Sequence, residues 1–229
     1  MPDINEAILK HFYEMISESK VEMFDKIAGD RTKFLTVVLE NIFQEHNASA
    51  VMRTCDCFGI QDLHAIEKNN KYTVQTEIAR GASQWVDLHT YSKGENPTKD
   101  CIQSLKDKGY RIVATTPHEN DHTVHDLPID KPIALVFGTE WTGISQEVID
   151  LADDFVKIPM YGFTESFNIS VCAALALQTL RKRLEDSGTP FTLSHEEQVS
   201  LKIDWSTKIV KNGGKVKEEI RNRLLDKRK

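Results

Sequence analysis

An asparagine at the start of one predicted helix and an arginine within that helix are the side chains best placed to do chemistry. Arg53 lies within Ala48–Phe58, a largely apolar run, and Asn47 directly precedes that run. A guanidinium stays protonated in proteins, and burying it without a partner is costly. We therefore expect Arg53 to meet a phosphate or a carboxylate. Asn47 could belong to the same site, or could simply cap the helix that the run predicts.

A second group of polar and glycine residues follows the apolar run Ile133–Phe137. Glu140 lies there between Gly138 and Gly143. These glycines do not make the dinucleotide fingerprint, which requires GxGxxG after the first strand and lets backbone approach a pyrophosphate. A carboxylate at this place would repel that anion. The pattern therefore disfavours NAD and ATP as ligands.

Strand-like and helix-like segments alternate along the middle of the chain and must position these side chains. We expect strands at Phe34–Leu39, Leu63–Ile66, Trp85–Leu88, Arg111–Thr115, Ile133–Phe137 and Phe155–Ile158. We expect helices at Ala48–Phe58, about Pro97–Lys108 and Ser166–Leu184. The alternation predicts an α/β fold, with a mostly parallel sheet and helices on both faces. Such a sheet binds nucleotide-type ligands beyond the carboxyl ends of its strands.

Taken in order, three parts of the sequence resemble the signature motifs of the SpoU-type RNA 2'-O-ribose methyltransferases of the SPOUT superfamily. They are Asn47–Thr54, Phe137–Gly143, and Ile158–Met160 leading into Ser166–Ser170. The similarity runs from about residue 34 to residue 183 and is strongest to the TrmH group, which methylates guanosine 18 in the D-loop of tRNA. Three motifs in order are much harder to match by chance than one short pattern.

The resemblance implies a fold and an activity that periodicity alone does not give. It implies the SPOUT fold with a C-terminal trefoil knot, an exception to the rule that chains avoid knots. It also implies S-adenosyl-L-methionine as cofactor, tRNA as partner and a homodimer packed through the knot region. Two alternatives stay open: a ribosomal RNA 2'-O-ribose methyltransferase, and a non-catalytic RNA-binding protein with the same fold.

The resemblance also assigns roles to individual residues. The catalytic set carried over is Arg53, Asn47, Glu140, Ser166 and Asn168. The residues carried over for cofactor contact are Thr115, Gly138, Ile158 and Phe167. Because arginine stays protonated, we expect Arg53 to bind the phosphate next to the target ribose and to stabilise the alkoxide that develops at the 2'-hydroxyl, instead of acting as a base. Ser166 could instead act as a helix N-cap, and Ile158 and Phe167 could instead pack in the core. Trp141 and Phe167 depart from the usual residues of the family.

The ends of the chain differ in composition from the middle. We expect a helical extension at residues 1–30, the methyltransferase domain at 31–187 and a basic helical tail at 188–229. From Ser206 onward the chain has nine basic and three acidic residues, a formal charge of +6. Because the net charge of the whole chain is −6, the residues before Ser206 carry −12. Local charge governs attraction to a phosphate backbone. The tail is therefore a candidate RNA contact, or else a solvated helix.

Several classes of protein are disfavoured by composition. No apolar run approaches the roughly 18 residues of a membrane span, and the N-terminus lacks a signal-peptide pattern, so we expect a cytoplasmic protein without membrane contact. The four cysteines lack metal or disulfide spacing, which favours buried, reduced thiols. The polar segment from His118 to Asp126 offers possible ligands but matches no zinc pattern. We expect no metal.

Overall fold

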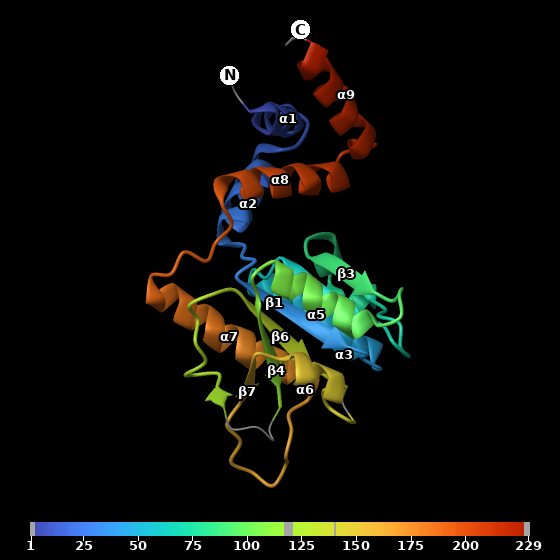
Figure 1. Cartoon of the computed structure of the whole chain (residues 1–229). Coiled ribbons are helices and arrows are strands. Elements are labelled where there is room, and N and C mark those ends of the chain that lie inside the picture. Colours follow the sequence, from blue (N-terminus) through green and yellow to red (C-terminus); the bar gives the residue numbers. More distant parts are fainter. Residues whose placement is uncertain (1–2, 117–120, 140, 227–229) are drawn as a thin grey trace. The chain divides into compact units, whose positions relative to one another are not determined.

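A parallel sheet forms the centre of the computed structural model, which describes residues 3–116, 121–139 and 141–226. Its strands within these residues are β1 (Leu35–Glu40), β2 (Asp62–Ile66), β3 (Asp87–Tyr91), β4 (Arg111–Thr115), β5 (His122–Thr123), β6 (Ile133–Phe137) and β7 (Asp154–Lys157). They lie in the order β3-β2-β1-β6-β4-β7-β5, and each neighbouring pair is parallel. The predicted α/β class with a mostly parallel sheet is therefore confirmed (Figure 1).

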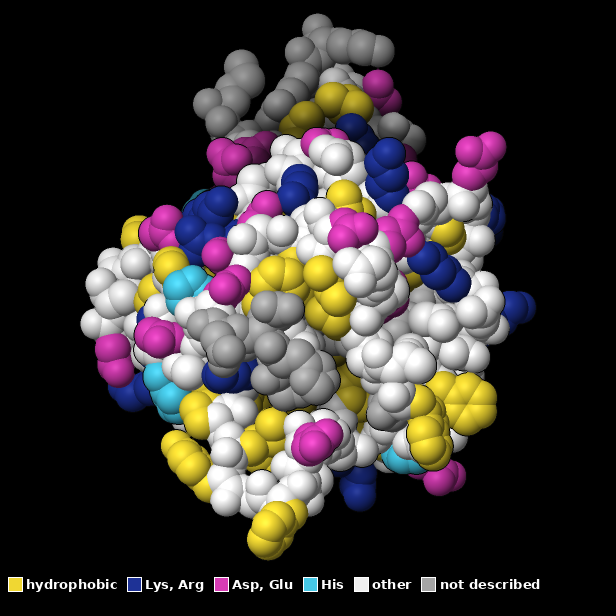
Figure 2. Space-filling model, turned by 60° about the horizontal axis from the view of Figure 1, so that its bottom comes forward, with side chains coloured by type: hydrophobic (Ala, Val, Ile, Leu, Met, Phe, Trp, Pro, Cys, Tyr) yellow, Lys and Arg dark blue, Asp and Glu magenta, His cyan; other side chains and the backbone are white. Residues whose placement is uncertain are grey.

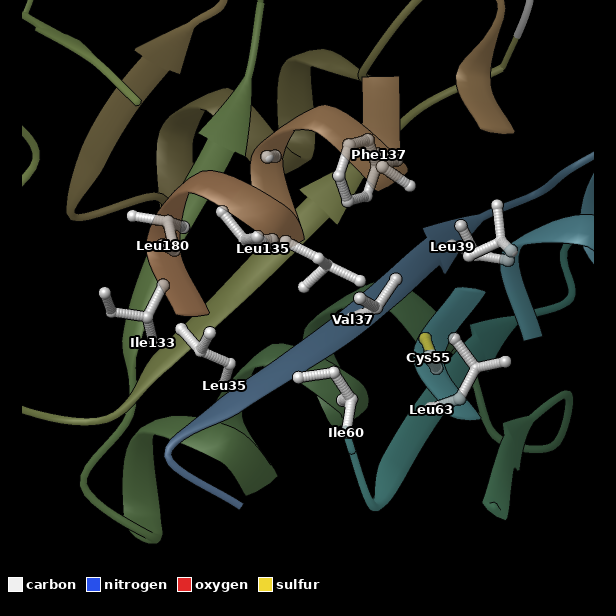
Figure 3. Packing of buried hydrophobic residues seen from close by; sticks show 14 of the residues in the cluster. Leu35, Val37, Leu39, Cys55, Ile60, Leu63, Ile133, Leu135, Phe137 and Leu180 are labelled. Carbon is white, nitrogen blue, oxygen red and sulfur yellow. The ribbon is translucent and has the colours of Figure 1, made fainter. Parts of the chain in front are cut away.

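Alternation along β1 builds two separate hydrophobic layers. Leu35, Val37 and Leu39 point to one face, whereas Val38 points to the other. Figure 3 shows the first layer, in which these three residues follow one another along β1 and Leu180 lies by Ile133 and Leu135 of the neighbouring strand β6. Both faces of the strand are buried, and its sequence is accordingly mostly apolar, with Thr36 and Glu40 as its buried polar residues.

Helices cover both faces of the sheet. They are α3 (Glu45–Cys57), α4 (Thr76–Ala79), α5 (Pro97–Asp107), α6 (Gln146–Leu151) and α7 (Ile169–Ser187), with a 3₁₀ turn at Ala82–Gln84. Buried residues of α3 and α7 share one layer with the odd-numbered residues of β1, and α5 and α6 pack on the opposite layer. Among the described residues, no helix has the length and apolar character of a membrane span.

Some expected boundaries are wrong. The strand expected at Trp85–Leu88 begins instead at Asp87, because Trp85 ends the 3₁₀ turn and the pairing of Asp87 with Asp62 sets the strand register. The short edge strand β5 lies in a polar segment where no strand was expected. Helix α3 begins three residues earlier than expected, and α7 begins three residues later.

The two ends of the chain form one helical unit, residues 1–31 with 192–229, distinct from the unit of residues 32–191. Its helices are α1 (Ile4–Tyr13), α2 (Glu18–Asp30), α8 (His195–Ile209) and α9 (Gly213–Asp226). Phe12 of α1, Ile203 of α8 and Ile220 of α9 lie in one buried cluster. Trp205 packs edge-on against Phe24, with ring centroids 5.3 Å apart. The segments expected as separate extensions thus share a core.

Candidate active site

A cavity of about 740 Å³ opens at the carboxyl ends of three neighbouring strands. Its lining includes the last residues of β4, β6 and β7, which are Thr115, Phe137 and Lys157. This edge of a parallel sheet is the usual place for a nucleotide-type ligand, and the volume is in the range of small-molecule sites. The cavity is therefore the candidate site of the α/β unit.

The structure brings together all four residues expected at the cofactor. Thr115, Gly138, Ile158 and Phe167 line the cavity, although they come from four different parts of the chain. The Thr115 hydroxyl donates to the carbonyl of Val136, 2.9 Å away, so its orientation is set within the sheet. Phe167 is 42% exposed, so core packing alone does not explain it. Ile158 is half-buried and packs against the core as well as lining the cavity.

Gly138 is required by the close approach of the chain that follows it. The turn from Thr139 to Gly143 folds back, with backbone hydrogen bonds of 2.9 and 3.1 Å between these two residues. A Cβ atom on Gly138 would lie 2.1 Å from the carbonyl group of Gly143, closer than packed atoms come. Gly143 has φ +68, a conformation that favours glycine. The Gly138–Gly143 spacing is thus a property of the loop that lines the cavity.

Asn47 does not cap its helix. It is the third residue of α3, is only 2% exposed, and follows the N-cap residue Gln44. Its Nδ2 donates to Oε1 of Gln44 at 2.8 Å, and its Oδ1 accepts from Nδ2 of Asn168 at 3.1 Å. The capping interpretation is therefore wrong, because the helix begins before this residue. Asn47 is a buried connection between α3 and the start of α7.

Asn168, not Ser166, caps α7. Oδ1 of Asn168 accepts from the backbone N–H of Ser170 at 2.9 Å and from its hydroxyl at 2.7 Å. Ser166 is exposed in the loop before the helix, so the N-cap interpretation for it is wrong. Both Ser166 and Asn168 line the cavity, as does Gln44, which sequence reasoning missed. A polar residue three positions before Asn47 was the only available signal for Gln44.

Arg53 lies on the exposed side of α3. The expectation that burial forces a partner on it is wrong, because its charge reaches solvent. It is not among the residues that line the cavity. It shares helix α3 with Asn47, and this helix packs against α7. Glu140, the remaining expected catalytic residue, lies outside the described residues.

The cysteines and the possible metal ligands offer no further reactive group at the cavity among the described residues. Cys172 lines the cavity, and burial raises the pKa of its thiol to about 11, so it is a thiol at neutral pH. Cys57 is exposed, contrary to the expectation of buried thiols, whereas Cys55 and Cys101 are buried. Within the described part of the chain, no three histidine, cysteine, aspartate or glutamate side chains gather closely enough to hold a metal ion. His118 and Glu119 of the polar segment lie outside that part.

These features define an α/β protein with a cavity at the carboxyl ends of its parallel strands and a hydrogen-bonded asparagine pair, of which one member, Asn168, lines that cavity. Residues 34–178 match the sequence model of the SpoU rRNA methylase family, and the chain belongs to that family. It is 42% identical over 199 residues to the tRNA (guanosine(18)-2'-O)-methyltransferase of Borreliella burgdorferi, covering 87% of this chain and 89% of that protein. It is 34% identical over 170 residues to the enzyme of that name from Thermus thermophilus, covering 74% and 86%.

A solved structure gives the same picture. The TrmH/SpoU tRNA-modifying enzyme of Aquifex aeolicus superposes with a TM-score of 0.75 at 30% identity, covering 85% of this chain and 98% of that chain. The likeness extends well beyond residues 34–178. The expected family is therefore confirmed by sequence and by fold.

Proposed function

We propose that this protein transfers a methyl group from S-adenosylmethionine to a ribose 2'-hydroxyl of RNA, and that its target is guanosine 18 of tRNA. Two relatives that match most of the chain are named tRNA (guanosine(18)-2'-O)-methyltransferase. The observation that carries the proposal is the cavity, which collects Thr115, Gly138, Ile158 and Phe167 with Ser166 and Asn168. Thr115, the second motif and the third motif lie far apart in the sequence, and chance would not gather residues of all three at one cavity.

The cavity suits the proposed cofactor. Ile158 and Phe167 offer apolar walls for an adenine ring, and the backbone around Gly138 can approach closely because no side chain stands there. Bound S-adenosylmethionine would supply the methyl group as an activated sulfonium, so the protein contributes chiefly alignment.

Arg53 and the asparagine pair have different roles, Arg53 in binding the RNA and the pair in positioning the helix that carries it. The exposed guanidinium of Arg53 binds the phosphate beside the target ribose and stabilises the negative charge that develops on the 2'-oxygen. The hydrogen bond between Asn168 and Asn47 fixes the start of α7 against the first turn of α3. The helix that carries Arg53 is thereby tied to the loop that lines the cavity.

The trefoil knot and the homodimer are part of the same proposal. The loop between β7 and α7 extends beyond the strand ends (Figure 1) and carries Tyr161 and Phe163 fully exposed. Val171 and Leu175, four residues apart on α7, are 44% and 39% exposed. Figure 2 shows apolar side chains projecting at this end of the molecule. Such surfaces mark interaction sites, and a second copy packed on the loop would cover them. A tRNA substrate also implies a cytoplasmic location.

Mapping ribose methylation in RNA from cells that lack the protein tests the proposal. We expect loss of the 2'-O-methyl group at guanosine 18 of tRNA, with ribosomal RNA unchanged. Loss at a ribosomal position instead would support the first alternative. Loss nowhere, together with no calorimetric response of the purified protein to S-adenosylhomocysteine, would support the non-catalytic alternative.

A further inference from the structure

Glu40 is a buried carboxylate that the proposed chemistry does not use. It is the last residue of β1, in the middle of the sheet, and is 3% exposed. Alternation along β1 places it with Val38 on the α5 and α6 face, opposite the face that α3 and α7 cover. A charged group is costly to bury unless its hydrogen bonds are satisfied.

The partners of Glu40 come mainly from one residue. Its Oε2 accepts from the backbone N–H of Ser145 at 2.9 Å, and its Oε1 accepts from the Ser145 hydroxyl at 2.6 Å. The hydroxyl of Thr98, in the first turn of α5, donates to Oε1 at 3.3 Å. Two donors of one residue thus converge on both oxygens of the carboxylate, an arrangement that fixes position as well as energy.

Ser145 stands where the cavity loop ends. It is the N-cap of α6, and its Oγ accepts from the backbone N–H of Val148 at 3.3 Å. The residue before it, Ile144, lines the cavity, as do Gly138 and Gly143. The loop from Gly138 to Ile144 therefore starts from β6 and ends at a residue held by Glu40.

We infer that Glu40 is a positioning residue for cofactor binding, which fixes the far end of the Gly138–Ile144 loop through Ser145. The inference rests on the proposed function, because it concerns the same cavity. The first end of the loop is held by pairing of Phe137 with Leu39 of β1. The second end is held by the next residue of the same strand, so a single strand of the sheet fixes both ends of the cavity loop.

The test compares variants by calorimetry with S-adenosylhomocysteine and by methyl-transfer kinetics on tRNA. Glu40→Met keeps the length of the side chain but accepts no hydrogen bond. We expect it to raise the Kd for S-adenosylhomocysteine and the KM for S-adenosylmethionine about tenfold or more, as when a bond to a charged group is lost. The kcat at saturating cofactor should stay within about twofold of wild type, and tRNA affinity should not change.

Two further variants separate positioning from plain stability. Glu40→Gln still accepts from the Ser145 N–H through its amide oxygen, so it should recover most of the cofactor affinity. Glu147→Met is the control. This carboxylate lies on α6, the helix that Ser145 caps, and accepts hydrogen bonds from Lys68 at 2.5 Å and from Asn96, but it does not line the cavity. It should leave the Kd for S-adenosylhomocysteine unchanged.

The outcomes separate this inference from the proposed function. If the wild-type protein does not bind S-adenosylhomocysteine, the proposed function fails. If the wild type binds it and folded Glu40→Met binds equally well, or if Glu147→Met weakens binding as much, Glu40 has no positioning role. Should Glu40→Met not fold, Ser145→Ala decides: it removes one of the two donors and should raise the same Kd severalfold, and an unchanged Kd overturns the inference.

Discussion

The side-chain amide of Asn168 donates a hydrogen bond to the side-chain oxygen of Asn47, 3.1 Å away, and so joins the N-cap of α7 to the first turn of α3. The other end of the Asn168 amide is occupied by Ser170, which fixes its orientation. Asn47 is held in turn by Gln44. The three amides form one chain of hydrogen bonds, with a member at each end that lines the cavity.

Exchanging Asn168 separates its two roles. Asn168→Asp keeps an N-cap oxygen but loses the donor to Asn47, whereas Asn168→Ala loses both. We expect both variants to lose methyl transfer to a similar extent, with Asn168→Ala less stable than Asn168→Asp by about 1 kcal/mol. Urea unfolding and single-turnover methylation measure the two quantities. Full activity in Asn168→Asp would show that the bond to Asn47 has no part in catalysis.

Removing the charge of Arg53 should affect chemistry alone. We expect Arg53→Ala to lower methyl transfer at least roughly a hundredfold, because a contact made to developing charge is lost. The Kd for S-adenosylhomocysteine should not change, and the free energy of unfolding should shift by less than about 0.5 kcal/mol, since the residue is exposed. Lys99→Ala, an exposed cation on α5, serves as the matched control and should keep full activity. Equal activity of both variants would remove Arg53 from the site.

Adding one methyl group at Gly138 should close the cavity loop to its ligand. Gly138→Ala places a Cβ 2.1 Å from backbone atoms of Gly143, so the turn must move. We expect cofactor binding to fall below detection in calorimetry, with a loss of stability of about 1–3 kcal/mol from overpacking. Gly162→Ala is the control, because the nearest atom to its added Cβ lies 4.0 Å away. Normal cofactor binding by Gly138→Ala would contradict the described turn.

The RNA contact of the basic helix α9 is best tested by substitution. Truncation at Ser206 would cut α8 and remove Ile220 from the shared core. Changing the exposed Lys215, Arg221 and Arg223 to glutamine should weaken tRNA binding and reduce the slope of log affinity against log salt by up to about 2. Lys93→Gln with Lys99→Gln on the other unit provides the comparison. Unchanged slopes in the α9 variant would mean that RNA is held elsewhere.

A buried histidine should make stability depend on pH. Burial, and secondly His89, which stacks on it at 4.7 Å, lower the pKa of His64 from 6.5 to about 4, while Asp62 opposes and Lys108 adds to the shift. The Tyr91 hydroxyl lies 3.4 Å from its Nδ1. The unfolded chain therefore takes up a proton near pH 6.5 that the folded protein takes up only near pH 4, so stability falls as pH drops through this interval.

Urea unfolding at pH 7 and pH 5 measures the effect. Between pH 7 and pH 5 we expect the free energy of unfolding of the wild type to fall by about 2 kcal/mol because of His64. In His64→Gln this contribution should be absent, so the fall should be about 2 kcal/mol smaller. A pH dependence of equal size in both proteins would mean that His64 is already charged in the folded state.

The strands could be predicted where both faces are buried, and not where they are half exposed. The apolar run at β1 identifies a strand within one residue at each end. At the sheet edge, β3 contains His89 and Thr90 and is only partly buried, so the apolar Trp85 and Val86 beside it gave the stronger but misleading signal. Its position depends on pairing with β2, which local sequence does not contain.

The site residues show the same division between local and tertiary information. Asn47 and Ser166 both fit the pattern of a helix cap, but α3 begins at Glu45, before Asn47, and α7 is capped by Asn168, after Ser166. The bond between Asn47 and Asn168 spans 121 residues, so no spacing rule could give it. Glu40 did carry a signal, a charge directly after Val38 and Leu39, and such a residue at the end of a buried strand merits attention as a support of the site.

The sharing of one core by both ends of the chain bears on how the protein is made. Helices α1 and α2 are synthesised before the unit of residues 32–191, yet Ile8 and Phe12 of α1 find their partners on α8 and α9, which are synthesised after it. Until then their apolar sides are open to wrong contacts, a hazard for nascent chains. The hydrogen bond between the side chains of Glu6 and His195 joins residues 189 positions apart. A chain that stops before α8 thus lacks both the apolar partners of α1 and the basic helix α9.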